Sequence, residues 1–221
     1  MPHARRGGRP SREASEKLRE LILDAATEQF LANGFGATSI EAVAQRLRMS
    51  KRTFYHRFSD KEALFAAVVH RIIERLRPPA GVPVIEGADL RSVLEHLAGL
   101  MVRAALSPQA IALHRLIVGE SARFPELAGV LAREGSTEEA IKLISGVLDR
   151  DVKGGQIKLD DTRFAARQFL QMAIGLPQRH GLGLAPMSKQ ELAEWPRKVT
   201  DLFLNGCRLA RPTGTIRATS R

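Results

Sequence analysis

The sequence predicts an all-α fold of about nine helices in two blocks, and three observations lead to this prediction. Of the 221 residues, 44% are hydrophobic but only 5% are aromatic, and Ala, Leu, Arg and Glu are abundant. This composition favours helices over strands. Apolar residues recur at three- and four-residue steps, which is the period of an amphipathic helix. Capping residues, glycines and prolines divide the chain at intervals typical of helices, and no segment is patterned as a strand.

The first helix is predicted over residues 15–33, where apolar residues follow the helical period. Gly34 is expected to end it, because glycine is favoured just past a helix C-terminus. Thr38 is expected to cap a second, short helix, since Glu41 three residues later completes a capping box. The apolar face of this second helix consists of Ile40, Val43, Ala44 and Leu47.

A tight connection at residues 48–49 leads to a third short helical segment over residues 51–57. Ser50 can cap this segment through its side-chain oxygen, and most of its side chains are polar or basic. Phe54 and Phe58, four residues apart, are expected to anchor it to the core.

The fourth helix is expected to begin at a capping box of Ser59 and Glu62 and to run to Arg77. Residues 78–88 contain three prolines and two glycines. Prolines lack a donor and glycines add backbone freedom, so this segment cannot sustain a helix. It is the predicted linker between two domains.

Five more helical patterns follow the linker. They begin after Asp89, after Ser107-Pro108, at Pro125, near Asp160 and near Ser188. The pattern that starts at Pro125 continues through Leu148, and proline suits a helix start because the missing N–H would have no partner there. The stretch 154–157 is expected to be a loop. Pro196 lies well beyond the Ser188 cap, so it either kinks the last helix or begins it.

The formal net charge of +10 is concentrated at the two ends of the chain. The N-terminal segment carries Arg5, Arg6, Arg9 and Arg12 without an acid, and the last fourteen residues carry four arginines. A basic arm is typical of nucleic-acid-binding proteins, because each cation that neutralises a phosphate releases counterions. We expect the N-terminal arm to contact DNA and the C-terminal segment to be a solvated tail.

The remaining composition narrows the class of protein. A single cysteine, Cys207, excludes an intramolecular disulfide and a zinc site built on a Cys pair, and predicts a cytoplasmic protein. Neither a signal peptide nor a membrane-spanning run is recognisable. The sequence also lacks a nucleophile elbow, a phosphate-binding glycine loop and His/Glu metal spacing. We therefore expect no enzyme, no metal, no cofactor and no membrane partner.

Two short helices joined by a tight turn, between two longer helices, are the pattern of a helix-turn-helix, whose second helix enters the DNA major groove. The alternative is a small helical bundle with a solvated basic face. Tyr55 beside His56 weighs against that alternative, because an aromatic ring is costly to expose without a partner.

A set of residues between positions 22 and 65 keeps a fixed spacing. It comprises Ile22, Ala25-Ala26, Phe30, Gly34-Phe35, Thr38-Ser39-Ile40, Val43-Ala44, Ser50-Lys51, Thr53, Phe54-Tyr55-His56, Phe58, Asp60-Lys61-Glu62 and Leu64-Phe65. This spacing resembles the DNA-binding domain of TetR/AcrR-family regulators. The resemblance covers about a fifth of the chain.

The resemblance implies roles for individual residues. The implied contacts to phosphate, base edges or a thymine methyl are Thr38, Ser39, Lys51, Arg52, Thr53, Tyr55, His56 and Lys61, with Arg5, Arg6 and Arg9 in the minor groove. Arg52 stands where relatives often carry glycine. An arginine can read guanine or hold a phosphate, so the DNA sequence preferred by relatives does not transfer to this chain.

The segment 113–127 resembles the regulatory domain of the AefR-like subgroup of the same family, through Leu113 to Ile117, Glu120 and Arg123 to Leu127. The resemblance implies a homodimer formed by the last two helices, with candidate seam residues Phe169, Leu170, Met172, Ala173, Ile174, Val199, Leu202 and Phe203. Candidates to line a pocket for a small hydrophobic or amphipathic effector are Leu97, Met101, Ile117, Ile144 and Met172. For both sets the alternative is plain core packing.

The predicted organisation is a flexible basic arm (1–14), a helix-turn-helix DNA-binding domain (15–77), a linker (78–88), a ligand-binding and dimerisation domain (89–208) and a flexible tail (209–221). The expected function is that of a dimeric, ligand-responsive repressor of a near-palindromic double-stranded DNA operator. Three alternatives stay open: an activator of the same fold, a ligand-independent DNA binder, and a small-molecule-binding protein or enzyme without specific DNA recognition.

Overall fold

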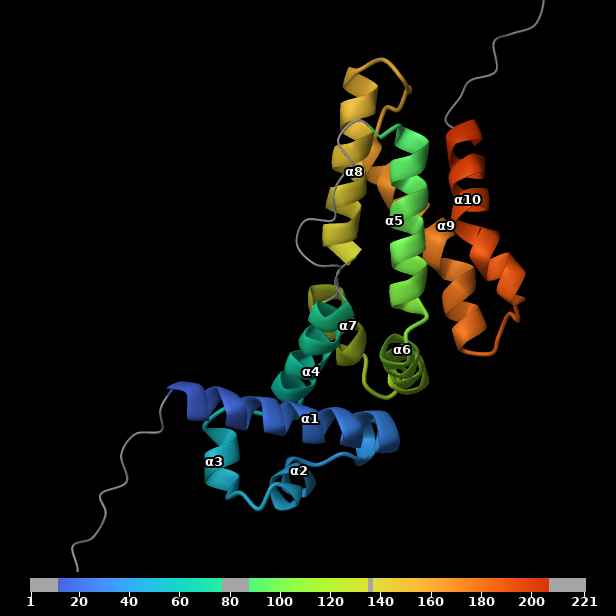
Figure 1. Ribbon diagram of the computed structural model, residues 1–221. Coiled ribbons are helices and arrows are strands. Elements are labelled where there is room, and N and C mark those ends of the chain that lie inside the picture. Colours follow the sequence, from blue (N-terminus) through green and yellow to red (C-terminus); the bar gives the residue numbers. More distant parts are fainter. Residues whose placement is uncertain (1–11, 77–87, 135–136, 207–221) are drawn as a thin grey trace, which may run out of the picture. The chain divides into compact units, whose positions relative to one another are not determined.

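The computed structural model describes residues 12–76, 88–134 and 137–206, and these residues form ten helices and no strand (Figure 1). The all-α prediction is confirmed. The helices pack into two compact units. The N-terminal unit contains α1 to α4 together with α6 and α7, and the C-terminal unit contains α5, α8, α9 and α10. The packing units thus do not follow chain order, because α6 and α7 pack with α1 and α4 although they lie between α5 and α8 in sequence.

Helix α1 (Arg12–Ala37) begins three residues earlier than predicted, within the segment expected to be a flexible arm. Its regular part ends at Gly34, which has φ 83° and ψ 169°. This backbone conformation is essentially restricted to glycine, so the predicted role of Gly34 as a helix terminator is confirmed. The side chains that α1 buries are Ile22, Leu23, Ala25, Ala26, Phe30 and Phe35.

Two predicted caps lie one residue later in the structure. Helix α2 (Ile40–Arg46) is capped by Ser39, whose side chain accepts a hydrogen bond from the N–H of Ala42 at 3.1 Å. Helix α4 (Lys61–Leu76) is preceded by Asp60, whose Oδ1 accepts from the N–H of Ala63 at 2.7 Å. Thr38 and Ser59 were wrong as caps because, in each pair of adjacent cap-forming residues, the second one faces the first turn of the helix.

The core of the N-terminal unit is centred on aromatic side chains. Phe35 packs with Phe30, Phe65 and Phe124 at ring-centroid distances of 5.8, 5.3 and 5.0 Å. Phe124 follows α6 (Pro108–Glu120) and precedes α7 (Glu126–Glu134). These two helices therefore contribute to the same core as α1 and α4.

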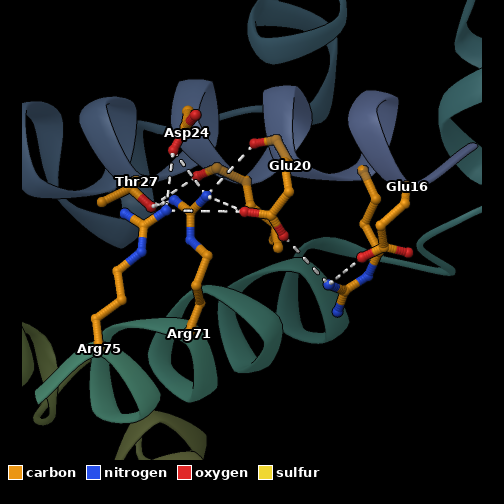
Figure 2. A network of polar contacts seen from close by, with 8 residues as sticks. Glu16, Glu20, Asp24, Thr27, Arg71 and Arg75 are labelled. Atoms are coloured by element: carbon orange, nitrogen blue, oxygen red, sulfur yellow. Dashed lines mark hydrogen bonds and ion pairs between the residues drawn. The ribbon is translucent and has the colours of Figure 1, made fainter. Parts of the chain in front are cut away.

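An ion-pair network joins α4 to α1 within this unit (Figure 2). Arg71, whose side chain is only 9% exposed, donates to Asp24 at 2.7 Å, to Glu20 at 3.3 Å and to the hydroxyl of Thr27 at 2.7 Å. Arg75 lies 3.7 and 3.8 Å from the same two carboxylates but is 62% exposed. The network aligns α4 against α1, the helix that supports α2 and α3.

The C-terminal unit packs α5 (Leu90–Ala105) against α8 (Thr137–Lys153), α9 (Thr162–Gly181) and α10 (Lys189–Gly206). Its buried core comprises Leu90, Val93, Leu94, Leu97, Ala98, Ile141, Ile144, Val147, Leu148, Ala165, Ala166, Phe169, Leu170, Ala173, Val199, Phe203 and Leu204. The prediction of one helical pattern from Pro125 through Leu148 is wrong, since α7 and α8 are separate helices that belong to different units. This difference accounts for ten helices where nine were expected.

Most helix starts in this region are confirmed. Asp89 caps α5, Ser107 caps α6 with Pro108 in the first turn, and Ser188 forms a capping box with Glu191 before α10. The loop predicted at 154–157 is also present. Pro196 lies inside α10, so it does not begin the last helix.

Most of the predicted linker and the C-terminal tail lie outside the described residues. Within the described part of the chain, no helix is long and apolar enough to span a bilayer.

Candidate DNA-binding interface

Helices α2 and α3 (Lys51–Tyr55) form the predicted helix-turn-helix, joined by a four-residue turn. The turn is closed by backbone bonds from Arg48 N–H to Gln45 and from Met49 N–H to Ala44, both 3.0 Å. Arg48 adopts a left-handed φ of 51°, which reverses the chain within few residues. The tight connection expected at residues 48–49 is confirmed.

Ser50 starts α3 as predicted. Its Oγ accepts a hydrogen bond from the N–H of Thr53 at 3.1 Å and lies 2.8 Å from the Thr53 hydroxyl. Such a cap supplies a partner to an N–H group that a helix leaves without one. Thr53, predicted to face the groove, is half-buried, and its hydroxyl and N–H both lie within hydrogen-bond distance of the Ser50 hydroxyl.

The side chains of α3 divide between the core and the solvent. Phe54 and Phe58 are 0% and 5% exposed, with ring centroids 5.7 Å apart, so both anchors are confirmed. Arg52 and His56 are exposed, and Tyr55 is 47% exposed with its ring against Phe54. The structure thus brings the predicted reading residues together on the side of α3 that faces away from the core.

Lys51 forms an ion pair with Glu41 of α2, with 3.0 Å between Nζ and Oε1. The hydrogen bond and charge of Lys51 lower the pKa of the Glu41 carboxyl. Both side chains are well exposed, and the solvent screens such exposed pairs, so the pair contributes little to stability. A phosphate can therefore compete for the ammonium of Lys51 at small cost.

Lys61 is engaged within the protein. Its Nζ donates to the carbonyl oxygens of Phe35 at 3.0 Å and Gly36 at 3.4 Å, and it lies 4.5 Å from the centre of the Phe35 ring. This lysine fixes the backbone that leads into α2. An ammonium has three donors, so one hydrogen of Lys61 is not used by these two carbonyl bonds.

Thr38 and Ser39 lie at the start of α2, where they were expected to meet a phosphate. Ser39 is partly exposed and caps the helix. Thr38 is 2% exposed, and its hydroxyl donates to the Gly34 carbonyl at 2.8 Å. The only hydroxyl hydrogen of Thr38 is thus used in the core, which argues against a side-chain contact to phosphate.

Two cations near α3 were not among the predicted site residues. Arg48 is exposed in the turn between the two helices, and Arg57 donates to the hydroxyl of Ser15 on α1 at 3.3 Å. Their position next to the reading helix could have been inferred from sequence, because both flank the segment already assigned to it. Arg5, Arg6 and Arg9 of the N-terminal arm lie outside the described residues.

The predicted effector-pocket residues divide between the two packing units. Ile117 is buried in the core of the N-terminal unit, whereas Leu97 and Ile144 are buried in the core of the C-terminal unit. Met101 and Met172 are partly buried against that second core. The alternative of plain core packing accounts for these positions.

A cavity of about 400 Å³ lies elsewhere in the C-terminal unit, between α5 and α10. It is lined by Gly99, Val102, Arg103, Leu106, Leu192, Ala193 and Pro196. We call it the α5–α10 cavity. None of the five predicted pocket residues lines it.

The predicted dimer seam is largely interior. Phe169, Leu170, Ala173, Val199 and Phe203 are all at most 8% exposed within one chain, and the rings of Phe169 and Phe203 pack at 5.0 Å. These five side chains pack into the core of their own chain, which favours the alternative of plain core packing over a dimer seam. Ile174 and Met172 are partly buried, and Leu202 is 66% exposed.

Comparison with known proteins agrees with this architecture. A model of the TetR family of bacterial regulatory proteins matches residues 22–68, and a model of the C-terminal domain of AefR-like transcriptional repressors matches residues 92–206. The HTH-type transcriptional regulator RutR of Escherichia coli (strain K12) is 30% identical over 181 residues, covering 81% of this chain and 80% of RutR. UidR of the same strain is 27% identical over 184 residues, covering 81% and 86%.

Among solved structures, the flavonoid-responsive regulator FrrA matches with a TM-score of 0.75 and 28% identity, over 89% of this chain and 100% of that one. The family models cover the helix-turn-helix and most of the chain that follows it. The chain therefore belongs to the TetR family of bacterial regulatory proteins, and it is a DNA-binding transcriptional regulator with an AefR-like C-terminal domain.

Proposed function

We propose that this regulator binds a near-palindromic DNA operator as a homodimer and represses transcription, with α3 of each subunit in the major groove. One observation carries the proposal. Phe54 and Phe58 fix α3 to the core while Arg52, Tyr55 and His56 remain exposed on it. Arginine bonds guanine through O6 and N7, and an aromatic ring edge suits a thymine methyl. The exposed face of α3 is therefore suited to sequence reading.

Within this proposal, Lys51, Arg48 and Ser39 hold the DNA backbone around α3. Lys51 exchanges its exposed pair with Glu41 for a phosphate, and Arg48 offers a second cation from the turn. Contacts of this kind position the protein without reading sequence. The basic arm adds Arg5, Arg6 and Arg9. We expect these three arginines to account for most of the salt dependence of DNA affinity that Lys51 and Arg48 do not explain.

The homodimer is proposed to form through α9 and α10, but with other residues than the buried seam. Phe164, Leu176 and Leu202 are 60%, 44% and 66% exposed, although all three are large apolar side chains. Large apolar side chains that stay exposed on two packed helices are candidates for a protein interface. A Leu202→Glu variant should shift the molar mass measured by light scattering from dimer towards monomer, whereas Lys189→Glu, at the start of the same helix and on another face, should not.

We also propose a response to a small apolar or amphipathic effector. FrrA, which shares the fold, is described as flavonoid-responsive. An effector that favours the non-binding arrangement of the two reading heads by a few kcal/mol, about the scale of ordinary allosteric coupling, is enough to release DNA. In this proposal the chain carries out no catalytic step, and it acts in the cytoplasm, where operator DNA lies.

Selection on random DNA duplexes with the purified, full-length protein tests the proposal. We expect one enriched motif with two inverted half-sites, spaced by about one helical turn. Recovery of duplexes without any shared motif would overturn specific recognition. A motif with a single half-site would overturn the dimeric arrangement and leave DNA reading intact.

An activator of the same fold would bind the same sites, so the selection does not distinguish it from a repressor. A reporter gene placed behind the recovered site does. Expression that rises when the regulator is deleted supports repression, and expression that falls supports activation.

A further inference from the structure

We propose that the α5–α10 cavity binds a small carboxylic acid with an apolar body, and that Arg103 recognises the carboxylate. The inference rests on the proposed response to an effector and names the chemical class of that effector. The cavity volume of about 400 Å³ falls within the range of about 300–1,000 Å³ that small-molecule sites occupy.

The walls of the cavity are apolar. Val102 and Leu106 contribute aliphatic side chains from α5, and Leu192 and Pro196 contribute them from α10. Gly99 provides the floor, because a Cβ at this position would lie 3.9 Å from the Pro196 ring and 3.3 Å from Nη1 of Arg103. A glycine inside a helix costs up to about 1 kcal/mol relative to alanine, and here its missing Cβ leaves room for the Arg103 guanidinium and the Pro196 ring beside α5. An apolar ligand body fits this lining.

Arg103 is the one charged residue of the lining. Its guanidinium lies across the Gly99 floor, as the 3.3 Å approach to the Gly99 Cβ position indicates. No carboxylate among the described residues lies within ion-pair distance of Arg103, whereas Arg91 of the same helix pairs with Asp201. The planar guanidinium binds carboxylates through two parallel hydrogen bonds, which gives both strength and orientation. Arg103 is exposed, so its guanidinium is accessible to a ligand. An acid is therefore the ligand class that complements the charge of the site.

The cavity is connected by the chain to the DNA-binding helices. Leu106 lines it, and the next residue, Ser107, is the N-cap of α6. At its other end α6 carries Glu120, which accepts a hydrogen bond from the N–H of Gly36 just before α2. Because Leu106 and Ser107 are consecutive residues, we expect a ligand that moves the end of α5 to act on the start of α6, the helix that holds the end of α1 through Glu120.

The chain contains a natural reporter for this site. Trp195 is the only tryptophan, it adjoins Pro196 of the cavity wall, and its Nε1 donates to the Ala173 carbonyl at 2.9 Å. Its fluorescence can be followed while the full-length protein is titrated with octanoate or 4-phenylbutyrate. The neutral controls are octanamide and 4-phenylbutanamide, which have the same apolar body without the charge.

We expect the acids to change the fluorescence saturably and to bind about tenfold or more tightly than the amides, which corresponds to about 1.4 kcal/mol or more. Arg103→Gln should remove this preference and leave amide binding unchanged. Arg179→Gln removes one exposed positive charge from α9 outside the cavity and should leave the preference intact. Ala193→Phe, which narrows the cavity from its exposed rim, should weaken acid and amide alike.

Equal affinity of acid and amide, no saturable binding of either acid at millimolar concentration, or an unchanged preference in Arg103→Gln would overturn the proposal. Operator binding measured on the same samples separates it from the proposed function. A protein that binds its selected DNA but no acid contradicts only the acid site. A protein that binds the acid through Arg103 but selects no DNA motif contradicts only the proposed operator recognition, and acid binding that leaves operator affinity unchanged contradicts the effector role of the site.

Discussion

Glu120 and Gly36 are joined by a hydrogen bond of 2.9 Å across 84 positions of the chain, with the Gly36 N–H donating to Oε2 of the carboxylate. Glu120 is the last residue of α6, and Gly36 lies just before α2. Lys61 holds the same segment from α4 through two backbone carbonyls. The end of α1 that leads into the helix-turn-helix is thus held by α6 and α4, so we expect a movement of α6 to shift the segment that precedes α2.

Removal of this clamp from α6 should affect stability and DNA binding together. Glu120→Ala leaves the Gly36 N–H without its charged acceptor, and bonds to charged groups are worth about 1.5–3 kcal/mol. We expect a loss of this size in the free energy of unfolding measured with urea, and weaker binding to the selected operator in a gel-shift titration. Glu126→Ala, an exposed glutamate in the first turn of α7, is the matched control and should change either quantity little. Operator affinity equal to wild type in Glu120→Ala would contradict the coupling.

The turn after α1 depends on glycine at one position. Gly34 has φ 83° and ψ 169°, and a Cβ there would lie 2.1 Å from Oε1 of Glu120. Gly34→Ala should therefore destabilise the protein by about 1–3 kcal/mol from backbone strain, with the collision added to it. Gly119→Ala, inside α6 with open space around its Cβ, should be neutral or stabilising by up to about 1 kcal/mol. Thermal unfolding of the two variants measures the contrast, and similar melting temperatures would count against the strained turn.

The network between α1 and α4 offers a test with two arginines that share the same carboxylates. Arg71 is nearly buried and bonds Asp24, Glu20 and Thr27, whereas Arg75 is exposed and more distant from the acids. Lysine keeps the charge, but its ammonium cannot form the same set of hydrogen bonds as the planar guanidinium. Arg71→Lys should cost about 1–3 kcal/mol of unfolding free energy, and Arg75→Lys less than about 0.5 kcal/mol. Equal costs in urea titrations would show that burial does not set the strength of this network.

Local signals predicted much of this fold from the sequence. Gly34 ended α1, Ser50 capped α3, and Phe54 and Phe58 anchored it, because each of these roles depends on neighbours within a few residues. Asp60 caps α4 in place of the predicted Ser59. Both residues have a side-chain oxygen that can accept a hydrogen bond from the first turn of a helix. Sequence pattern alone does not decide between them.

Long-range packing was the part that the sequence did not reveal. The apolar period of Phe169 and Phe203 fits a subunit core and a dimer seam equally well, and the structure assigns both residues to the core. Ile117 follows the same helical period as Leu97, yet the two residues belong to different units. The α5–α10 cavity was missed for a similar reason. Gly99 and Arg103, which line it, do not follow the apolar period from which the pocket residues were predicted.

The cap of α4 should make stability depend on pH at the acid end. Hydrogen bonds from the Ala63 N–H and then from the Ser59 hydroxyl hold the pKa of the Asp60 carboxyl below its ordinary value. A lowered folded-state pKa stabilises the protein above the unfolded pKa, and this contribution is lost as the pH falls through the folded pKa, so the window lies below about pH 4. Asp60→Asn keeps the cap oxygen but not the charge. Unfolding free energies measured across this window should fall less steeply for Asp60→Asn than for wild type, and parallel curves would exclude the carboxylate as a contributor.

If the exposed face of α3 reads DNA sequence, Arg52 is the residue whose removal should show it most directly. The measurement is the ratio of dissociation constants for a scrambled duplex and the selected operator, at one salt concentration, for wild type and Arg52→Ala. Loss of a base contact is worth about 1–3 kcal/mol of discrimination, so the ratio should fall by about fivefold or more while binding to scrambled DNA changes little. An equal loss of affinity for both duplexes would mean that Arg52 holds only the phosphate backbone, and would contradict sequence reading by this residue.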